Sequence, residues 1–308
     1  MLNIFLGNDC NFNCPYCLQP KGGRQTRKLD MERITAFITG KSITDIRFWG
    51  GEPLLYIDLI KEIVAGLEHR GIDVNMAMVT NGSLLNSDMV DFLNQKSIFT
   101  CLSYHAEMRL ESLGFMAALE SRGVNYLVTR QSLYLWDLIN LQDRFADTFG
   151  QHIAALPIYV KATPACPPPF HLNPKAVGFH MDHLRLLHRT GLAPQILETL
   201  KGNWDQVAQR FKPGYARCMN PEHVSVDISG RILPCHYAQD TGDPEMGPGF
   251  IPDVDLIPGT QRYIHSKECG ECEVLPYCQG GCHLSLTHET DCLLTRQLYT
   301  FLYKEIGR

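Results

Sequence analysis

The chain has 308 residues, a net charge of -5 and a sequence pI near 6.2, with 44% hydrophobic and 20% charged residues. The mild negative charge gives no reason to expect nucleic acid or an anionic membrane as a partner, and no apolar stretch approaches the roughly 18–20 residues that span a bilayer. The first residues lack the basic start and apolar core of a signal peptide. We therefore expect a cytoplasmic protein, in which structural disulfides are rare.

Short apolar runs that are typical of strands alternate with helical patterns up to about residue 160. Six such units in succession predict a parallel α/β sheet, either open or closed into a complete or partial barrel. In either case the chemistry belongs at the carboxyl ends of the strands. The predicted strands are 3–7, 45–49, 74–80, 98–103, 124–129 and 153–160, and the helical patterns lie near 31–37, 54–67, 89–93, 108–119 and 133–145.

The alternation stops at the proline-rich segment 163–169, and helical patterns return at 177–188 and 195–211. Beyond these, glycine, proline and cysteine become frequent, and the sequence around Gly230 predicts a hairpin with that glycine in its turn. A unit with so little core needs metal to hold it together. We therefore divide the chain into a barrel-like domain, 1–200, and a small cysteine-rich domain, 201–308.

Twelve cysteines in a cytoplasmic protein indicate metal, and Cys10, Cys14 and Cys17 lie in one loop directly after the first strand. A zinc knuckle completed from elsewhere is one interpretation, although no fourth ligand follows nearby. Three thiolates on a [4Fe–4S] cluster would leave one iron open for a substrate or cofactor. The second strand then ends in Gly50-Gly51-Glu52, the Gly-Gly-Glu turn. Its glycines permit close backbone approach to a ligand, and its carboxylate suits an ammonium group.

The Cys-x3-Cys-x2-Cys loop, with Tyr16 before its last cysteine and Phe-Trp-Gly-Gly-Glu-Pro ending the next strand, resembles the radical SAM superfamily. The resemblance implies a partial (β/α)6 TIM barrel. The three cysteines would hold a [4Fe–4S] cluster whose open iron is chelated by S-adenosylmethionine (SAM). The Gly-Gly-Glu turn would contact the methionine amino group, and Tyr16 would belong to the cofactor site. An electron from the cluster would cleave SAM to a 5′-deoxyadenosyl radical.

Polar residues at the next two strand ends are further candidates for SAM binding. Thr80 and Asn81 close the third strand, and Ser103 closes the fourth at a position that often binds the ribose in this family. Turn chemistry is the alternative interpretation, because Asn81-Gly82 readily forms a turn. Cys101 lies inside an apolar strand, and we expect it in the core.

Seven cysteines lie beyond residue 217, in the order Cys-x11-Gly-x4-Cys, then Cys-x2-Cys-x5-Cys-x3-Cys, then one more. A Cys-x2-Cys pair alone is equally compatible with zinc. The full order resembles the SPASM extension of some radical SAM enzymes, which holds two auxiliary iron–sulfur clusters. The resemblance implies three [4Fe–4S] clusters in all. The ligands of one auxiliary cluster would be Cys269, Cys272, Cys278 and Cys292, and those of the other Cys218, Cys235 and Cys282.

The second set lacks the additional cysteine that sulfatase-maturating relatives carry shortly before the first one. That cluster is either open at one iron or completed from elsewhere, with Cys166 as a candidate and an unligated thiol as the alternative. His236 follows Cys235, where those relatives carry an aspartate and the enzyme of pyrroloquinoline quinone biosynthesis a histidine. We interpret His236 as a catalytic base, the alternative being a histidine that donates to cluster sulfur.

Three more histidines, at 180, 183 and 188, share a predicted helix with several leucines. Their spacing places the first two on one face, which we expect to be solvated rather than metal-binding.

The resemblance implies a radical SAM/SPASM oxidoreductase that abstracts hydrogen from a peptide or protein, giving oxidation, a crosslink or epimerisation in peptide maturation. It implies a reducing partner such as flavodoxin or ferredoxin. Because the first cysteine comes at residue 10, we expect no N-terminal winged-helix domain for a leader peptide. Either a separate leader-peptide-binding protein recognises the peptide, or the barrel and the C-terminal domain do so alone. The alternative is a radical SAM dehydrogenase or epimerase acting on a small molecule in natural-product or cofactor biosynthesis. A non-catalytic iron–sulfur or zinc protein is a third interpretation, which the Gly-Gly-Glu turn disfavours.

Overall fold

The computed structural model describes residues 1–17, 28–104, 110–159, 166–211, 224–233, 267–279 and 286–306. In these ranges seven strands form one sheet, in the order β6-β5-β4-β3-β2-β1-β7, and every neighbouring pair is parallel. The strands are β1 (Leu2–Phe5), β2 (Asp45–Trp49), β3 (Asn75–Thr80), β4 (Phe99–Tyr104), β5 (Arg122–Val128), β6 (Ala155–Tyr159) and β7 (Val224–Asp227). The α/β class is confirmed, and the six predicted strands are present to within two residues at either end.

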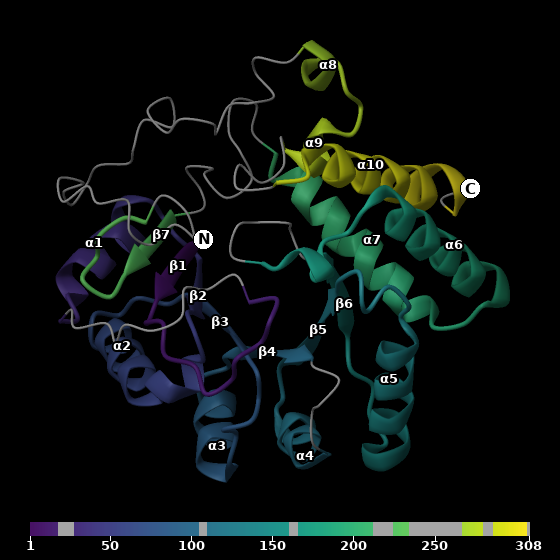
Figure 1. The fold of residues 1–308 in the computed structure, drawn as a ribbon. Helices are drawn as coiled ribbons and strands as arrows, with labels where there is room; N and C mark the ends of the chain where they lie inside the picture. Colours follow the sequence, from purple (N-terminus) through teal and green to yellow (C-terminus); the bar gives the residue numbers. More distant parts are fainter. Residues whose placement is uncertain are drawn as a thin grey trace.

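Helices follow the strands around the outside of the sheet. Figure 1 shows α1 to α5 in succession along its outer side, with α6, α7 and α10 grouped beyond β6. None of the described helices is long and apolar enough to cross a membrane. The longer helices are α1 (Met31–Gly40), α2 (Ile57–His69), α3 (Ser87–Gln95), α4 (Leu110–Ala118), α5 (Trp136–Phe149), α6 (Pro174–Thr190), α7 (Pro194–Gln209) and α10 (His288–Tyr299). Short turns are η1 (Pro53–Tyr56), η2 (Pro168–Phe170), α8 (Lys267–Gly270), α9 (Leu275–Cys278) and η4 (Thr300–Glu305).

The two faces of the sheet differ in their exposure to water. On β2, Ile46 and Phe48 are 1% and 0% exposed and belong to the main apolar core, whereas Arg47 between them is exposed. Because successive residues of a strand point to opposite faces, Arg47 lies on the face opposite the core. Phe99 at the start of β4 is likewise 40% exposed. One face is therefore sealed by helices, and the other is partly open.

Strand β7 is the seventh strand, one more than the sequence predicts. It pairs with β1 in the register Leu2↔Val224, and the buried Asn3 side chain donates to Ser225 Oγ at 3.3 Å across the pair. The predicted hairpin is also present, because Gly230 adopts φ +73° and an antiparallel bridge follows the turn. The strand therefore lies beyond residue 200 and yet belongs to the barrel sheet. The division of the chain at that residue stays a prediction.

The expectation of a solvated face is wrong for two histidines of α6. His180 and His183 are 0% and 4% exposed. His180 Nδ1 lies 2.6 Å from the Leu133 carbonyl, which only accepts, so Nε2 accepts the Tyr159 hydroxyl hydrogen at 3.0 Å. His183 Nε2 accepts the Leu135 N–H at 2.9 Å. Both rings are thus core residues, and both ring nitrogens of His180 are satisfied, while His188 of the same helix is exposed.

Candidate functional site

The cysteine loop is docked on the turn that ends β2. The Gly51 N–H donates to the Gly7 carbonyl at 2.8 Å, and the Glu52 N–H donates to the Asp9 carbonyl at 2.8 Å. These bonds continue the pairing of β1 with β2 past the ends of both strands. The first cysteine therefore emerges at the carboxyl edge of the sheet, where a parallel α/β sheet carries its chemistry.

The glycines at this junction allow two backbones to come close. Gly50 has φ +152°, and a Cβ there would lie 2.5 Å from the Gly7 carbonyl oxygen. A Cβ on Gly51 would collide with the Asp9 carbonyl, and one on Gly7 would collide with the Tyr56 hydroxyl. That hydroxyl accepts the Asp9 N–H at 2.9 Å. The sequence predicts close approach to a ligand; the close approach seen here is to the chain's own loop. The sequence carries no signal for Tyr56.

Glu52 connects the ends of β2 and β3. Its side chain is 1% exposed, and Oε1 accepts the Thr80 hydroxyl at 2.5 Å and the Leu54 N–H at 3.0 Å. Oε2 accepts the Asn81 N–H at 2.8 Å. Burial raises the pKa of Glu52, while these hydrogen bonds oppose the rise by favouring the carboxylate. The Glu52 carboxylate, which the sequence predicts to face an ammonium group, is thus buried and also links the ends of β2 and β3 through hydrogen bonds.

A group of three polar side chains connects the cysteine loop to the turn after β3. Asn81 Nδ2 donates to Asn11 Oδ1 at 2.9 Å, and Asn11 Nδ2 donates to Ser83 Oγ at 2.8 Å. The Ser83 hydroxyl and N–H both donate to Asn81 Oδ1, at 2.6 and 2.9 Å. We call Asn11, Asn81 and Ser83 the loop latch. Together with Glu52, the loop latch joins the ends of β1, β2 and β3.

The three thiols of the loop are close enough to influence one another. Partial burial raises the pKa of Cys10, the Phe12 N–H lowers it, and Glu52 and Cys17 raise it further. Burial also raises the pKa of Cys14, and the two other thiols of the loop add to that rise. A bound cation would oppose these effects by stabilising the thiolates.

Other predicted residues of the barrel domain lie as follows. Tyr16 packs edge-on against Phe170 of η2, with ring centroids 5.7 Å apart. Ser103 is half-buried, one residue before the end of β4. Cys101 is a core residue as predicted, and burial raises its pKa to about 12. Cys166 is 2% exposed, and its Sγ lies 3.9 Å from the carbonyl of the following proline.

Four C-terminal cysteines lie within the described residues. The Cys272 N–H donates to the Cys269 carbonyl at 3.1 Å in a turn between α8 and α9, and Cys278 ends α9. Arg296 of α10 lies 3.9 Å from Cys272 Sγ, and the thiols of Cys292 and Cys272 raise its pKa. Arg296 thus stands beside two predicted ligands of one auxiliary cluster. Outside the described residues lie the other predicted ligands and the predicted base: Cys218, Cys235, Cys282 and His236.

Nowhere in the described ranges do three cysteine, histidine or acidic side chains meet closely enough to hold a single metal ion.

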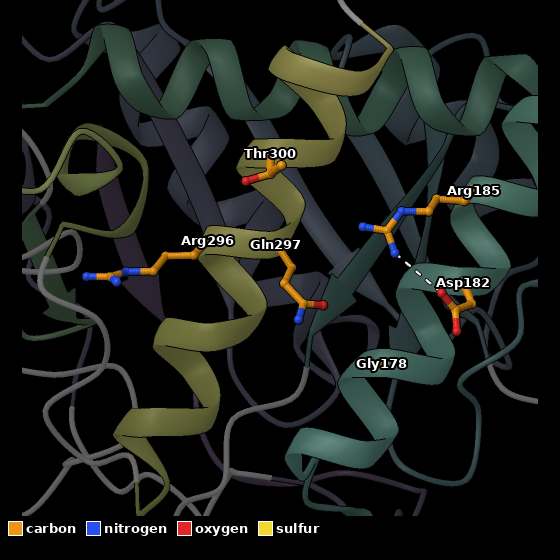
Figure 2. A pocket seen from close by; sticks show the side chains of 6 residues that line it. All are labelled: Gly178, Asp182, Arg185, Arg296, Gln297 and Thr300. Carbon is orange, nitrogen blue, oxygen red and sulfur yellow. Dashed lines mark hydrogen bonds and ion pairs between the residues drawn. The ribbon is translucent and has the colours of Figure 1, made fainter.

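A separate pocket of about 270 Å³ lies between α6 and α10. Figure 2 shows Asp182 and Arg185 paired along α6, and Arg296 of α10 directed away from both. Arg185 also binds Glu305, at 2.9 and 3.0 Å. Asp182 and Arg185 at this pocket are therefore paired, and none of the residues predicted for the SAM site line it.

Comparison with known families bears on the carboxyl edge. The sequence profile described as the Radical SAM superfamily matches residues 4–100. Over this segment, the chain resembles the radical SAM superfamily. The matched segment contains the cysteine loop, the Gly-Gly-Glu turn and all three residues of the loop latch.

Two curated relatives resemble different shares of the chain. A GTP 3',8-cyclase of Chlorobaculum tepidum is 33% identical over 91 residues, which are 29% of this chain and 27% of the cyclase. The chain thus spans 27% of the length of that relative. The radical SAM cyclopropyl synthase TigE of Paramaledivibacter caminithermalis is 21% identical over 91% of this chain and 67% of its own length.

A solved structure supports the fold over the whole chain. The structure of anSMEcpe with bound AdoMet and a Cp18Cys peptide superposes with a TM-score of 0.68 at 14% identity, covering 99% of this chain and 97% of the other. At this identity the likeness concerns the fold.

The likeness to the radical SAM superfamily implies a SAM-binding [4Fe–4S] cluster and SAM. The donor set fits both, because three neighbouring thiols supply ligands for three irons and leave the fourth open. Asn8 Oδ1, two residues before the first cysteine, is buried and has no hydrogen-bond partner among the described residues. It is an acceptor at the edge where the ammonium group of SAM would need one.

Proposed function

We propose that this protein is a radical SAM oxidoreductase that modifies a side chain of a peptide or protein. The observation that carries the proposal is the docking of the cysteine loop on the Gly-Gly-Glu turn, through bonds of 2.8 Å from Gly51 and Glu52. Those bonds place the first thiol beside a buried carboxylate at the carboxyl edge of the barrel sheet.

Each part of the site would have its own task. Cys10, Cys14 and Cys17 would hold the [4Fe–4S] cluster, which supplies the electron that cleaves SAM to a 5′-deoxyadenosyl radical. Glu52 would accept a hydrogen bond from the SAM amino group while its other bonds keep it fixed. Residues on the open face of the sheet would hold the substrate near the radical. Tyr16 and Ser103 are the proposed contacts to the remainder of SAM.

A peptide substrate is supported by one likeness. The fold of anSMEcpe, solved with a peptide, matches nearly all of the chain. The C-terminal cysteines add to this, since two auxiliary clusters would give the second electron of a net oxidation a route out of the substrate. His236 is the proposed base for the accompanying proton. A flavodoxin or ferredoxin would reduce the first cluster, and a separate leader-binding protein would present the peptide.

A small anionic molecule is the second candidate, and Arg47 favours it. This guanidinium lies on the open face of the barrel sheet and forms no hydrogen bond or ion pair with the part of the chain that the structure describes. Desolvation lowers the pKa of Arg47, Cys101 opposes this, and the charge of Arg210 lowers it further. A bound carboxylate or phosphate would stabilise this guanidinium. The resemblance to a GTP 3',8-cyclase, whose named substrate is a small molecule, points the same way.

The test begins with anaerobic purification and iron–sulfur reconstitution of the full chain, followed by iron and sulfide counting. SAM and dithionite are then added, and 5′-deoxyadenosine is measured. About twelve irons and cleavage of SAM support three clusters and the radical mechanism. About four irons per chain together with SAM cleavage would contradict the two auxiliary clusters. Bound zinc without SAM cleavage would contradict both enzymatic candidates.

The second stage separates the two substrate classes. Peptides encoded near the gene and GTP, as a probe for anionic small molecules, are each incubated with the reconstituted enzyme, and deuterium transfer to 5′-deoxyadenosine is followed. Peptide turnover that survives Arg47→Gln supports the first candidate. GTP binding that is lost in Arg47→Gln and kept in Arg70→Gln supports the second; Arg70 is the control because it is exposed at the end of α2.

A further inference from the structure

Cys10 is flanked on both sides by residues that are fixed to other strands. On its N-terminal side, the Asp9 N–H donates to the Tyr56 hydroxyl at 2.9 Å and the Asp9 carbonyl accepts the Glu52 N–H at 2.8 Å. On its C-terminal side, the Asn11 side chain bonds to Asn81 and to Ser83, at 2.9 and 2.8 Å. The loop is therefore held at two points one residue either side of its first thiol.

The two attachments belong to one closed circuit of hydrogen bonds. Asn81 binds Asn11 through its side chain and Glu52 through its backbone N–H. Glu52 in turn binds the loop through its own N–H, to the carbonyl of Asp9. The circuit thus runs from the loop to the end of β2, to the turn after β3, and back to the loop. A closed circuit resists opening more than separate bonds do, because each bond holds the partners of the next in place.

The Asn81 amide has little capacity left for a ligand. Its Oδ1 accepts two hydrogens from Ser83, at 2.6 and 2.9 Å, and its Nδ2 donates to Asn11. The side chain is also among the groups that lower the pKa of Cys10, so it lies beside that thiol. A SAM contact by this amide would require the loop latch to open.

We propose that Asn11, Asn81 and Ser83 are positioning residues that hold Cys10 in place to bind iron. In this proposal the Asn81 side chain fixes the cysteine loop and does not contact SAM. This inference rests on the proposed function in one respect, namely that the loop binds iron. The positioning itself is a property of the metal-free chain. An ordered first thiol removes part of the entropy that three-point attachment of a cluster would otherwise cost.

Hydrogen exchange tests the positioning without any cluster. Amide exchange over residues 8–17 is measured on the metal-free full chain, under reducing and anaerobic conditions, for the parent and for Asn11→Ala, Ser83→Ala and Asn81→Ala. Each variant is expected to exchange about fivefold faster in this segment, the order that the loss of one hydrogen bond gives. Asn13→Ala is the matched control, since Asn13 is an exposed asparagine of the same loop that makes no side-chain bond with the described residues. Ser83→Thr keeps the hydroxyl and is expected to restore the parent rate.

Cluster assembly and SAM binding complete the test. Asn11→Ala and Ser83→Ala are expected to slow the growth of iron–sulfur absorbance during reconstitution, and Asn13→Ala is not. After loading, all three variants of the loop latch are expected to bind SAM with affinities within about twofold of one another. A tenfold weaker binding in Asn81→Ala alone would make Asn81 a SAM contact and overturn the assignment. Parent-like exchange in Asn11→Ala and Ser83→Ala would overturn the positioning role, even if the enzyme proved active. Failure of the chain to take up iron would remove the proposed function and leave the exchange result standing.

Discussion

Thr80 donates its hydroxyl hydrogen to Oε1 of Glu52 at 2.5 Å, between the carboxyl ends of β3 and β2. Both side chains are 1% exposed, so the bond is shielded from water. A hydrogen bond to a buried charge contributes more to stability than one at the surface. If the buried carboxylate loses a donor, no water molecule can replace it.

Thr80→Val is therefore expected to lower the free energy of unfolding by about 1–3 kcal/mol, since it keeps the shape of the side chain and removes the donor. Thr80→Ser retains the hydroxyl and serves as the control. The measurement is urea denaturation of the full chain under reducing conditions. A Thr80→Val variant as stable as the parent would contradict the contribution of this hydrogen bond.

His180 predicts a dependence of stability on pH. Burial lowers its pKa to about 4, the Leu133 carbonyl raises it, and the neighbouring His183 lowers it. Its other ring contact is the Tyr159 hydroxyl, which is uncharged in this range. In the unfolded chain an imidazole titrates near pH 6.5, so between these values the unfolded state binds a proton that the folded state does not.

The sign follows from this difference. The contribution of His180 is present above about pH 6.5 and is lost as the pH falls toward about 4. The total loss is on the order of 3 kcal/mol, from the size of the pKa difference. His180→Gln should flatten the fall in unfolding free energy between pH 6.5 and 4, whereas substitution of the exposed His188 on the same helix should not. An unchanged slope in His180→Gln would contradict the buried neutral imidazole.

Gly51→Ala is expected to dislodge the cysteine loop, because a Cβ there would collide with the Asp9 carbonyl and backbone cannot turn aside as a side chain can. The expected cost is roughly 1–3 kcal/mol of stability, together with reduced iron uptake on reconstitution. Gly40→Ala at the end of α1 is the matched control, since nothing lies within 4 Å of the added Cβ. It is expected to be neutral or slightly stabilising. Parent-like iron uptake in Gly51→Ala would contradict the docking described here.

Asn3 and Ser225 provide a test of the seventh strand by a double-mutant cycle. Asn3→Leu or Ser225→Ala alone removes one partner of a buried 3.3 Å bond and should cost about 1–3 kcal/mol. The double variant should cost less than the sum, with a coupling of about 0.5–3 kcal/mol from urea unfolding curves. Strict additivity would mean that the two strands do not pair through these side chains in solution.

The strands of the barrel sheet were predictable because their apolar runs are short, β-rich and separated by helical periodicity. Residues 45–49 show this well, and the structure begins and ends β2 there. The first three cysteines and the Gly-Gly-Glu turn were predictable for another reason, since they combine an unusual spacing with a fixed place after consecutive strands.

What the sequence concealed depends on contacts between distant segments. Val224–Asp227 is only four residues long and looks like half of a hairpin, and nothing local says that it also pairs with β1. The burial of His180 could not be read from α6, because its partners are Leu133 and Tyr159 on other elements. Tyr56 likewise acts on a loop 47 residues away. Helical periodicity identifies an apolar stripe, but it does not reveal that a polar residue such as His180 is buried in that stripe with its hydrogen bonds made.

Pairing of β1 with β7 has a consequence for how the chain folds. Asn3 and Ser225 are 222 positions apart, so β1 lacks one of its two neighbours until most of the chain has left the ribosome. Contacts of such separation form late, because the loop that they close must lose its entropy before the contact stabilises anything. Until then the edge of β1 that later pairs with β7 is unpaired, and another nascent chain can pair with it. Slow release of residues 224–227 during synthesis would thus favour aggregation through the strand that leads into the cysteine loop.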